Sequence, residues 1–332
     1  MAGAMAILNC AHAQGLSAAR LGVLYNADDP RSHAIALFYA AKRSIPAANV
    51  LGLHLGSATA LAPAAFAPLR KQAIDQLPTE VQALALIWSR PFAVGCMSIT
   101  TAFAAGYRPG FCVPGCGLTE LNPLFDTDGW LPADTVGWWP AMLIPTDDPG
   151  LAHAVIESGI ESGGTASDGT TSRGTLYLVR TQDAARNARA ATYAEAESAL
   201  ADRVAIVELT SPVVRDVPHA IGYFTGAARV QELSRIHFLP GAVADHLTST
   251  GGVLTGGNQM SATAWLGQGA TGSYGSVSEP CNHLEKFPNI SILMGRYLRG
   301  ETLLEAYWKS VAMPGQGLFV GEPLARPFGS HP

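Results

Sequence analysis

Two residues in the C-terminal third have the types that a cysteine hydrolase needs. His246 ends one apolar segment and Cys281 ends the next. A cysteine attacks as its thiolate, so it needs a neighbouring base, most often histidine, to take the thiol proton. Because side chains at adjacent strand ends lie close together, His246 and Cys281 are a candidate catalytic pair, with Glu279 beside Cys281. In the alternative, Cys281 forms a disulfide, with Cys96 as one candidate partner, and His246 is a capping or surface residue.

The number of cysteines also indicates the redox environment of the protein. The chain has five, and four remain if Cys10 is removed with a leader, an even number that suits disulfides in an oxidising environment. Cys112 and Cys116 flank Val-Pro-Gly, a turn sequence that can bring two sulfurs together. We therefore predict a Cys112–Cys116 disulfide. A zinc site needs a second ligand pair, and none lies nearby.

Two further places are candidates for ligand binding. Asp28 and Asp29 follow the first apolar segment, where carboxylates of α/β folds often face a ligand. Asp-Asp-Pro is also a turn that caps a helix, and the same tripeptide recurs at 147–149. Trp138 and Trp139 lie in a loop rich in aromatic residues, which either holds a ligand or packs on the core. No histidine motif for a metal and no cofactor motif is present, so we expect neither.

The elements that position these residues alternate between short apolar runs and helical patterns. Apolar strand candidates span 21–25, 50–55, 81–88, 175–179, 204–209, 220–224 and 241–247. Uninterrupted apolar strands separated by helices are typical of a parallel sheet covered on both faces. The predicted fold class is therefore α/β, a three-layer α/β/α sandwich with a mainly parallel sheet. The strands near Val23, Leu53, Leu86 and Val243 are expected to share that sheet.

The predicted organisation has four parts. Residues 1–15 resemble the end of a secretory signal peptide, an apolar run that closes on Ala-His-Ala, although no Lys or Arg precedes Arg20; a plain apolar arm is the alternative. Residues 16–162 form an N-terminal α/β half and 175–332 a C-terminal one. A Gly/Ser/Thr-rich tract at 163–174 is expected to be a flexible loop between them. A signal-peptide remnant implies an exported protein, periplasmic or extracellular.

Composition excludes several classes of partner. Hydrophobic residues make up 48% of the chain and charged residues 14%, so it can bury a large core. The net charge is −5 and no basic stripe occurs, which argues against a nucleic acid as partner. No apolar run is long enough to span a membrane. A protein or peptide remains as a partner class.

Several segments resemble an uncharacterised family of bacterial exported proteins. They are the stretch from Leu21 to Leu51, HLTSTGG at 246–252, SATAWLGQGATGSYGSVSEPC at 261–281, and the stretch from Glu301 to Phe328. This resemblance covers most of the chain and implies no activity.

A more distant resemblance is to gingipain-type, caspase-like cysteine peptidases. That family has a Gly-His-Gly step after one strand, a catalytic Cys after the next, a Gly-Ala-rich strand and a Gly-Asp-Pro-like ending. In this chain the position of the His step is occupied by Tyr-Phe-Thr-Gly at 223–226, and that of the catalytic Cys by Thr-Ser-Thr-Gly at 248–251. The Gly-Ala-rich strand corresponds to GATGSYG at 269–275, and the ending to Gly-Glu-Pro-Leu at 321–324. The resemblance implies a caspase-like C-terminal half with Thr225 in place of His and Ser249, or Thr250, in place of Cys.

These substitutions remove the chemistry of that family. A hydroxyl is a weak nucleophile without a base beside it, and threonine is no base near neutral pH. We therefore expect a non-catalytic binding or structural protein on a degenerate peptidase scaffold. The alternative is a cysteine hydrolase that uses Cys281 with His246.

Overall fold

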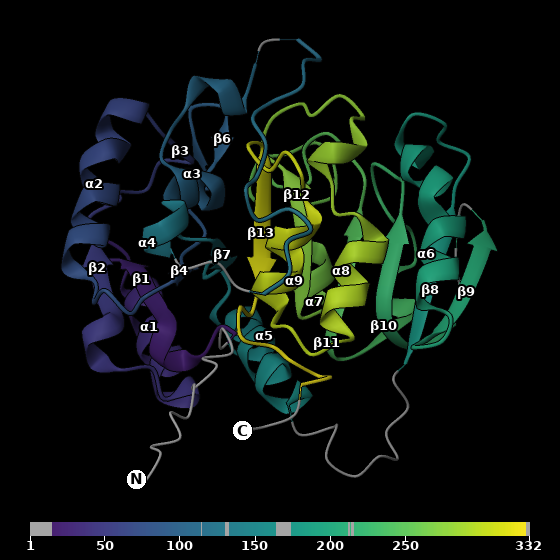
Figure 1. Cartoon of the computed structure of the whole chain (residues 1–332), viewed down its shortest axis with the longest axis horizontal. Helices are drawn as coiled ribbons and strands as arrows, with labels where there is room; N and C mark the ends of the chain where they lie inside the picture. Colours follow the sequence, from purple (N-terminus) through teal and green to yellow (C-terminus); the bar gives the residue numbers. More distant parts are fainter. Residues whose placement is uncertain are drawn as a thin grey trace, which may run out of the picture.

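The computed structural model describes residues 15–113, 115–129, 133–163, 174–211, 213 and 216–329. Those residues form one ten-stranded sheet with the order β2-β1-β4-β7-β13-β12-β11-β10-β8-β9 (Figure 1). The strands are β1 (Leu21–Asn26), β2 (Val50–Leu53), β4 (Ala83–Ile87), β7 (Ala141–Ile144), β8 (Thr175–Arg180), β9 (Ala205–Thr210), β10 (Val217–Thr225), β11 (Ile236–His246), β12 (Gly272–Ser276) and β13 (Gly317–Gly321). A small sheet holds β3 (Ala60–Leu61), β5 (Ala93–Val94) and β6 (Met97–Ser98).

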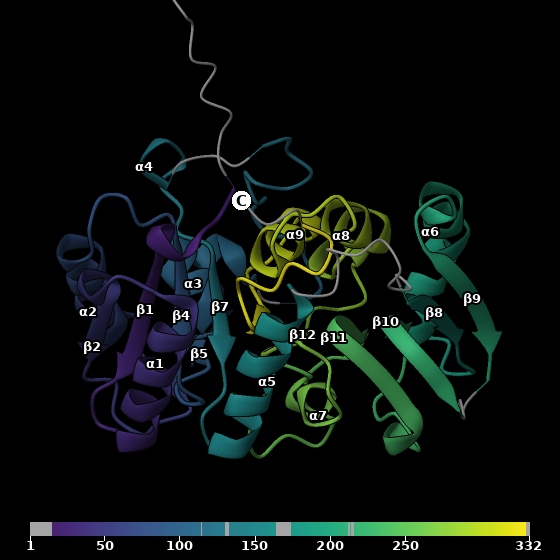
Figure 2. The same ribbon diagram turned by 90° about the horizontal axis from the view of Figure 1, so that it is seen from below.

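Helices cover both faces of the large sheet. They are α1 (Pro30–Arg43), α2 (Pro63–Gln76), α3 (Ile99–Ala105), α4 (Ala133–Val136), α5 (Pro149–Ser162), α6 (Tyr193–Leu200), α7 (Thr263–Gly267), α8 (Ile290–Tyr297) and α9 (Leu303–Ser310). Figure 2 shows α1, α5 and α7 on one face, and α6, α8 and α9 on the other. The three-layer α/β/α prediction is confirmed.

The sheet is mainly parallel. Within the described residues β12 and β13 pair antiparallel, and the other neighbours in the large sheet pair in parallel. The strands near Val23, Leu53, Leu86 and Val243 are β1, β2, β4 and β11, so the prediction of one shared sheet is confirmed. All five residues of β4 are buried, as expected of a central parallel strand covered on both faces.

The last strand joins the two halves of the sequence. β13 lies between β7 from the N-terminal half and β12 from the C-terminal half, so the sheet is continuous through the predicted boundary. Residues 164–173 of the predicted flexible loop lie outside the described residues, as do residues 1–14 of the predicted signal-peptide remnant.

Glu322 links the two halves a second time, directly after β13. Its fully buried carboxylate accepts hydrogen bonds from Tyr39 Oη at 2.6 Å and from Arg43 Nε at 3.1 Å, both on α1. Arg43 Nη2 also lies 2.5 Å from the carboxylate. The C-terminal segment is thus tied to the first helix by a buried ionic contact.

Among the described residues, no helix combines the length and apolar character needed to span a membrane.

Candidate functional site

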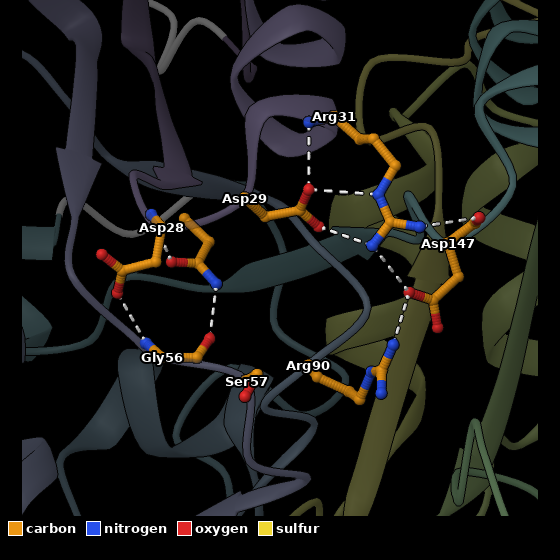
Figure 3. A pocket seen from close by; sticks show the side chains of 8 residues that line it. Asp28, Asp29, Arg31, Gly56, Ser57, Arg90 and Asp147 are labelled. Carbon is orange, nitrogen blue, oxygen red and sulfur yellow. Dashed lines mark hydrogen bonds and ion pairs between the residues drawn. The ribbon is translucent and has the colours of Figure 1, made fainter.

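A polar pocket lies where four parallel strands end. The chain passes from β1 through α1 to β2 on one side, and then through α2 to β4 on the other side of β1. This reversal is the topological switch point at which open α/β sheets bind ligands. A pocket of about 340 Å³ opens there (Figure 3). It is lined by Asn26, Asp28, Asp29, Arg31, Gly56, Ser57, Arg90 and Asp147.

Asp29 and Arg31 form one wall of this pocket at the start of α1. Asp29 is the N-cap of α1 and accepts a hydrogen bond from the backbone N–H of Arg31 at 3.0 Å. The guanidinium of Arg31 folds back onto the same carboxylate, with Nε at 3.1 Å from Oδ1 and Nη2 at 3.0 Å from Oδ2. Burial acts to raise the pKa of Asp29, but the hydrogen bonds from Arg31 outweigh it and lower the pKa. Asp29 therefore caps α1 and also lines the pocket, and its ligand-binding role stays a prediction.

Asp28 has a different environment. Its Oδ1 lies 2.7 Å from Nδ1 of His54, and its Oδ2 accepts a hydrogen bond from the backbone N–H of Gly56 at 2.8 Å. The hydrogen bonds from His54 and Gly56 lower the pKa of Asp28, so the side chain is ionised at neutral pH. Both partners come from the loop after β2, which has a left-handed backbone at Gly56 (φ +68°). Asp28 is thus held at the pocket wall, as the ligand-binding hypothesis requires.

Asn26 is a pocket residue that the sequence reading missed. Its side-chain oxygen accepts hydrogen bonds from the backbone N–H groups of Asp28 at 3.1 Å and Leu55 at 3.3 Å. Its amide nitrogen donates to the carbonyl of Gly56 at 2.8 Å. One buried side chain therefore sets the spacing of the loops after β1 and β2. The available signal was its place at the end of the first apolar strand.

Arg90 and Asp147 close the pocket from the loops after β4 and β7. Arg90 Nη2 donates to Oδ1 of Asp147 at 3.1 Å, and each side chain is about one-third exposed. Arg31 Nη1 donates to the backbone carbonyl of Asp147 at 3.2 Å. The backbone N–H of Asp147 in turn donates to Oγ of Ser89 at 2.9 Å. The second Asp-Asp-Pro turn thus supplies a pocket residue, Asp147, and a helix cap, Asp148, which accepts from Gly150 N at 2.9 Å.

The aromatic candidates lie elsewhere. Trp138 is 4% exposed and packs edge-on against Phe111 and Trp308, with ring centroids 5.6 and 6.0 Å apart. Trp139 lies under the guanidinium of Arg70, 5.5 Å from its ring centroid. Neither tryptophan lines the pocket. Their contacts agree with the packing interpretation, because the rings fill space between the loop and the core. Trp130, in the same aromatic loop, lies outside the described residues.

The predicted cysteine pairing is wrong. Cys96 is bonded to Cys112, with their Cα atoms 5.9 Å apart, and Cys116 is bonded to Cys281, with their Cα atoms 5.3 Å apart. The fold places the turn between β5 and β6, which carries Cys96, and the segment after β12, which carries Cys281, against the 112–116 loop. Each sulfur of that loop therefore meets a partner that is distant in sequence instead of its neighbour.

The candidate His246–Cys281 pair is not formed. Cys281 is in a disulfide and supplies no thiol, and Glu279 accepts the backbone N–H of Cys281 at 2.8 Å instead of tuning a nucleophile. His246 is 2% exposed, and both ring nitrogens are engaged. Nδ1 accepts from Trp265 Nε1 at 2.9 Å, and Nε2 lies 2.9 Å from the carbonyl of Met260. A carbonyl only accepts, so Nε2 carries the proton and the ring has no free lone pair.

The positions that the peptidase resemblance assigns to the catalytic pair, Thr225 and Ser249, lie at the end of β10 and in the turn after β11. Thr225 is buried at the end of β10, and its carbonyl accepts from Leu247 N at 2.9 Å and from Arg189 Nη2 at 3.2 Å. In the turn after β11, Gln259 Oε1 accepts from Thr248 Oγ1 at 2.7 Å and from Thr250 N at 2.8 Å. Within the described part of the chain, the hydroxyl of Ser249 has no hydrogen-bond partner.

His246 makes stability depend on pH. Burial lowers the pKa of His246 to about 4, whereas a histidine in an unfolded chain titrates near 6.5. Between these values the unfolded chain binds a proton that the native protein does not, so the free energy of unfolding falls as pH drops from about 6.5 to about 4. A shift of this size corresponds to about 3 kcal/mol. We expect the difference in stability between pH 7 and pH 4 to shrink by about that amount in His246→Gln, measured by urea unfolding. An unchanged difference would contradict the assignment.

No protein-family model matches the sequence, and no curated protein matches it. A solved structure described as "Structure of Protease" is similar to this chain, with a TM-score of 0.44 and 11% sequence identity; the match covers 94% of this chain and 79% of that chain.

Proposed function

We propose that this chain binds a small polar molecule in the pocket at the carboxyl ends of β1, β2, β4 and β7. The observation that carries the proposal is the way the pocket is built. Asn26, Asp28 and Arg31 come from the end of β1 and the start of α1. Hydrogen bonds tie this segment to Gly56 in the loop after β2 and to Asp147 in the loop after β7. Small-molecule sites are usually preformed clefts of about 300–1,000 Å³ in which a few convergent polar groups orient the ligand. The lining here is polar throughout, which favours a polar ligand.

We further propose that the protein is not a peptidase. Peptide cleavage needs an activated nucleophile and a proton acceptor within hydrogen-bond reach. Among the residues that the structure describes, Ser249 has neither a histidine nor a carboxylate bonded to it, and the alternative nucleophile Cys281 is bonded in a disulfide. The C-terminal half is then a degenerate peptidase scaffold that supports the ligand-binding half through β13.

The disulfides support a proposal on location. Two disulfides in one chain fit an oxidising compartment better than a reducing cytosol. We therefore propose that the protein is exported and acts in the periplasm or outside the cell.

Binding is tested by thermal unfolding with a panel of small polar metabolites. We expect a pocket ligand at 100 times its Kd to stabilise the wild-type protein by about 2.7 kcal/mol. Ser57→Trp places a large side chain in the pocket and should abolish that shift. The matched control is Ser198→Trp on the exposed face of α6, which should keep it. A compound that stabilises all three proteins equally does not bind in the pocket, and a panel without any Ser57-dependent shift would refute the proposal.

Peptidase activity is tested with a peptide library. We expect no turnover above background in the wild-type protein and no change on Ser249→Ala. Turnover that Ser249→Ala abolishes would refute the non-catalytic proposal. The assay is run without reductant, because reduction would free the thiol of Cys281 and change the protein under test.

A further inference from the structure

The pocket has an acidic side that no guanidinium neutralises. Asp28, Asp29 and Asp147 supply three carboxylates, and Arg31 and Arg90 supply two guanidinium groups. Arg31 pairs with Asp29 and Arg90 with Asp147. Among the described residues the ionic partner of Asp28 is His54, whose side chain is 80% exposed. Each oxygen of Asp28 accepts one hydrogen bond and keeps a lone pair for a further donor.

The opposite side of the pocket has a guanidinium with spare donors. Arg90 uses Nη2 for Asp147, and within the described residues its Nε and Nη1 have no partner. Nε and Nη1 lie on different edges of the guanidinium, so each offers a separate charged hydrogen bond to an anion. The hydroxyl of Ser57 is likewise without a partner there. Figure 3 shows Asp28 and Arg90 on opposite sides of the pocket, with Ser57 between them.

This arrangement disfavours a simple anion such as a phosphate. Three carboxylates and two guanidinium groups line the pocket, so the lining itself carries a net negative charge. The N–H groups that begin α1 are also engaged, because Asp29 accepts the backbone N–H of Arg31. A helix end that is already capped by a carboxylate offers an anion neither free donors nor a favourable field.

We infer that the pocket binds a zwitterion of the α-amino-acid class, with its ammonium group on Asp28 and its carboxylate on Arg90 and Ser57. The inference rests on the proposed function. Each pole of such a ligand meets a group of opposite charge that has unused hydrogen-bonding capacity. An ammonium donates to the free lone pairs of Asp28, and a carboxylate accepts from Nε or Nη1 of Arg90.

The test is a titration of the wild-type protein by calorimetry with the twenty common α-amino acids. For each one that binds, the N-acetylated form and the decarboxylated amine are titrated as well. We expect each modification to weaken binding about tenfold or more, because each removes one charged hydrogen bond. Binding that survives both modifications would overturn the inference, and this comparison does not depend on the folding of any variant.

Two variants then assign the poles. Asp28→Asn should weaken binding of the amino acid but leave the N-acetylated form unaffected, because that form lacks the ammonium. Arg90→Gln should weaken binding of the amino acid but leave the decarboxylated amine unaffected. Asp202→Asn and Arg299→Gln, both at exposed positions, are the matched controls and should bind as the wild type does.

The failures are distinguishable. If no amino acid binds but another polar compound gives a shift that Ser57→Trp abolishes, the ligand class is wrong and the binding function stands. If nothing binds in a Ser57-dependent manner, both the ligand class and the proposed binding function are wrong.

Discussion

Removal of the Cys116–Cys281 disulfide is expected to lower the free energy of unfolding by about 5 kcal/mol. The bond joins residues 165 positions apart, so in the unfolded chain it closes a long loop and removes much conformational freedom. The Cys96–Cys112 bond joins residues only 16 positions apart, and its removal should cost about 3 kcal/mol. The two bonds share the 112–116 loop, so the comparison is made within one local environment.

The measurement is urea unfolding of two double variants. Cys116→Ala/Cys281→Ala removes the long-range bond without leaving a free thiol, and Cys96→Ala/Cys112→Ala is the matched control. Peptide mapping after alkylation without reductant checks the pairing in the wild-type protein. Equal losses in the two variants, or a mapped Cys112–Cys116 bond, would contradict the assignment.

Replacement of Arg189 by methionine is expected to cost about 3–5 kcal/mol of stability. Arg189 precedes α6 and is ion-paired with Asp245 of β11; the two side chains are 4% and 2% exposed. Arg189 also donates to the carbonyl of Thr225 at 3.2 Å, and its guanidinium lies 5.2 Å from the ring centroid of Phe224. Burial raises the pKa of Asp245, and Arg189 opposes that rise. Without Arg189 the carboxyl group is left buried and uncompensated.

A double variant separates the charge from the packing. Arg189→Met/Asp245→Leu removes both charges and should recover most of the loss, because a buried apolar pair carries no desolvation penalty. Arg235→Met is the surface control: Arg235 pairs with Asp216 at 3.3 Å where both are exposed, and its loss should be below about 1 kcal/mol. A double variant no more stable than Arg189→Met alone would show that the charge is not the cause.

The alternation of strands and helices could be predicted from the sequence alone. Buried parallel strands such as β4 appear as continuous apolar runs, and helices appear between them with caps such as Asp29 and Asp148. The predicted sheet membership of β1, β2, β4 and β11 follows from these local signals. Asp28 was also found this way, because the carboxyl end of a strand is a local position.

The pairing of cysteines from distant segments could not be predicted from the sequence. Cys112 meets Cys96 and Cys116 meets Cys281 because the fold brings the 95–96 turn and the segment after β12 to the same loop. Spacing along the chain favoured the nearer partner, since a short loop closes at little entropic cost, but the tertiary contacts overrode it.

The chemistry of individual side chains was likewise decided in three dimensions. The sequence determined which residue types stand at the strand ends: aspartates after β1 and β7, and threonines and serine after β10 and β11. Only the tertiary structure decided that Asn26, Arg90 and Asp147 share a pocket with Asp28, and that His246 is buried against Trp265 instead of facing a nucleophile. The physical reason is that a side chain's reactivity depends on its burial and hydrogen-bond partners, and here those partners come from distant segments, as for Arg31 and Asp147, which are 116 positions apart.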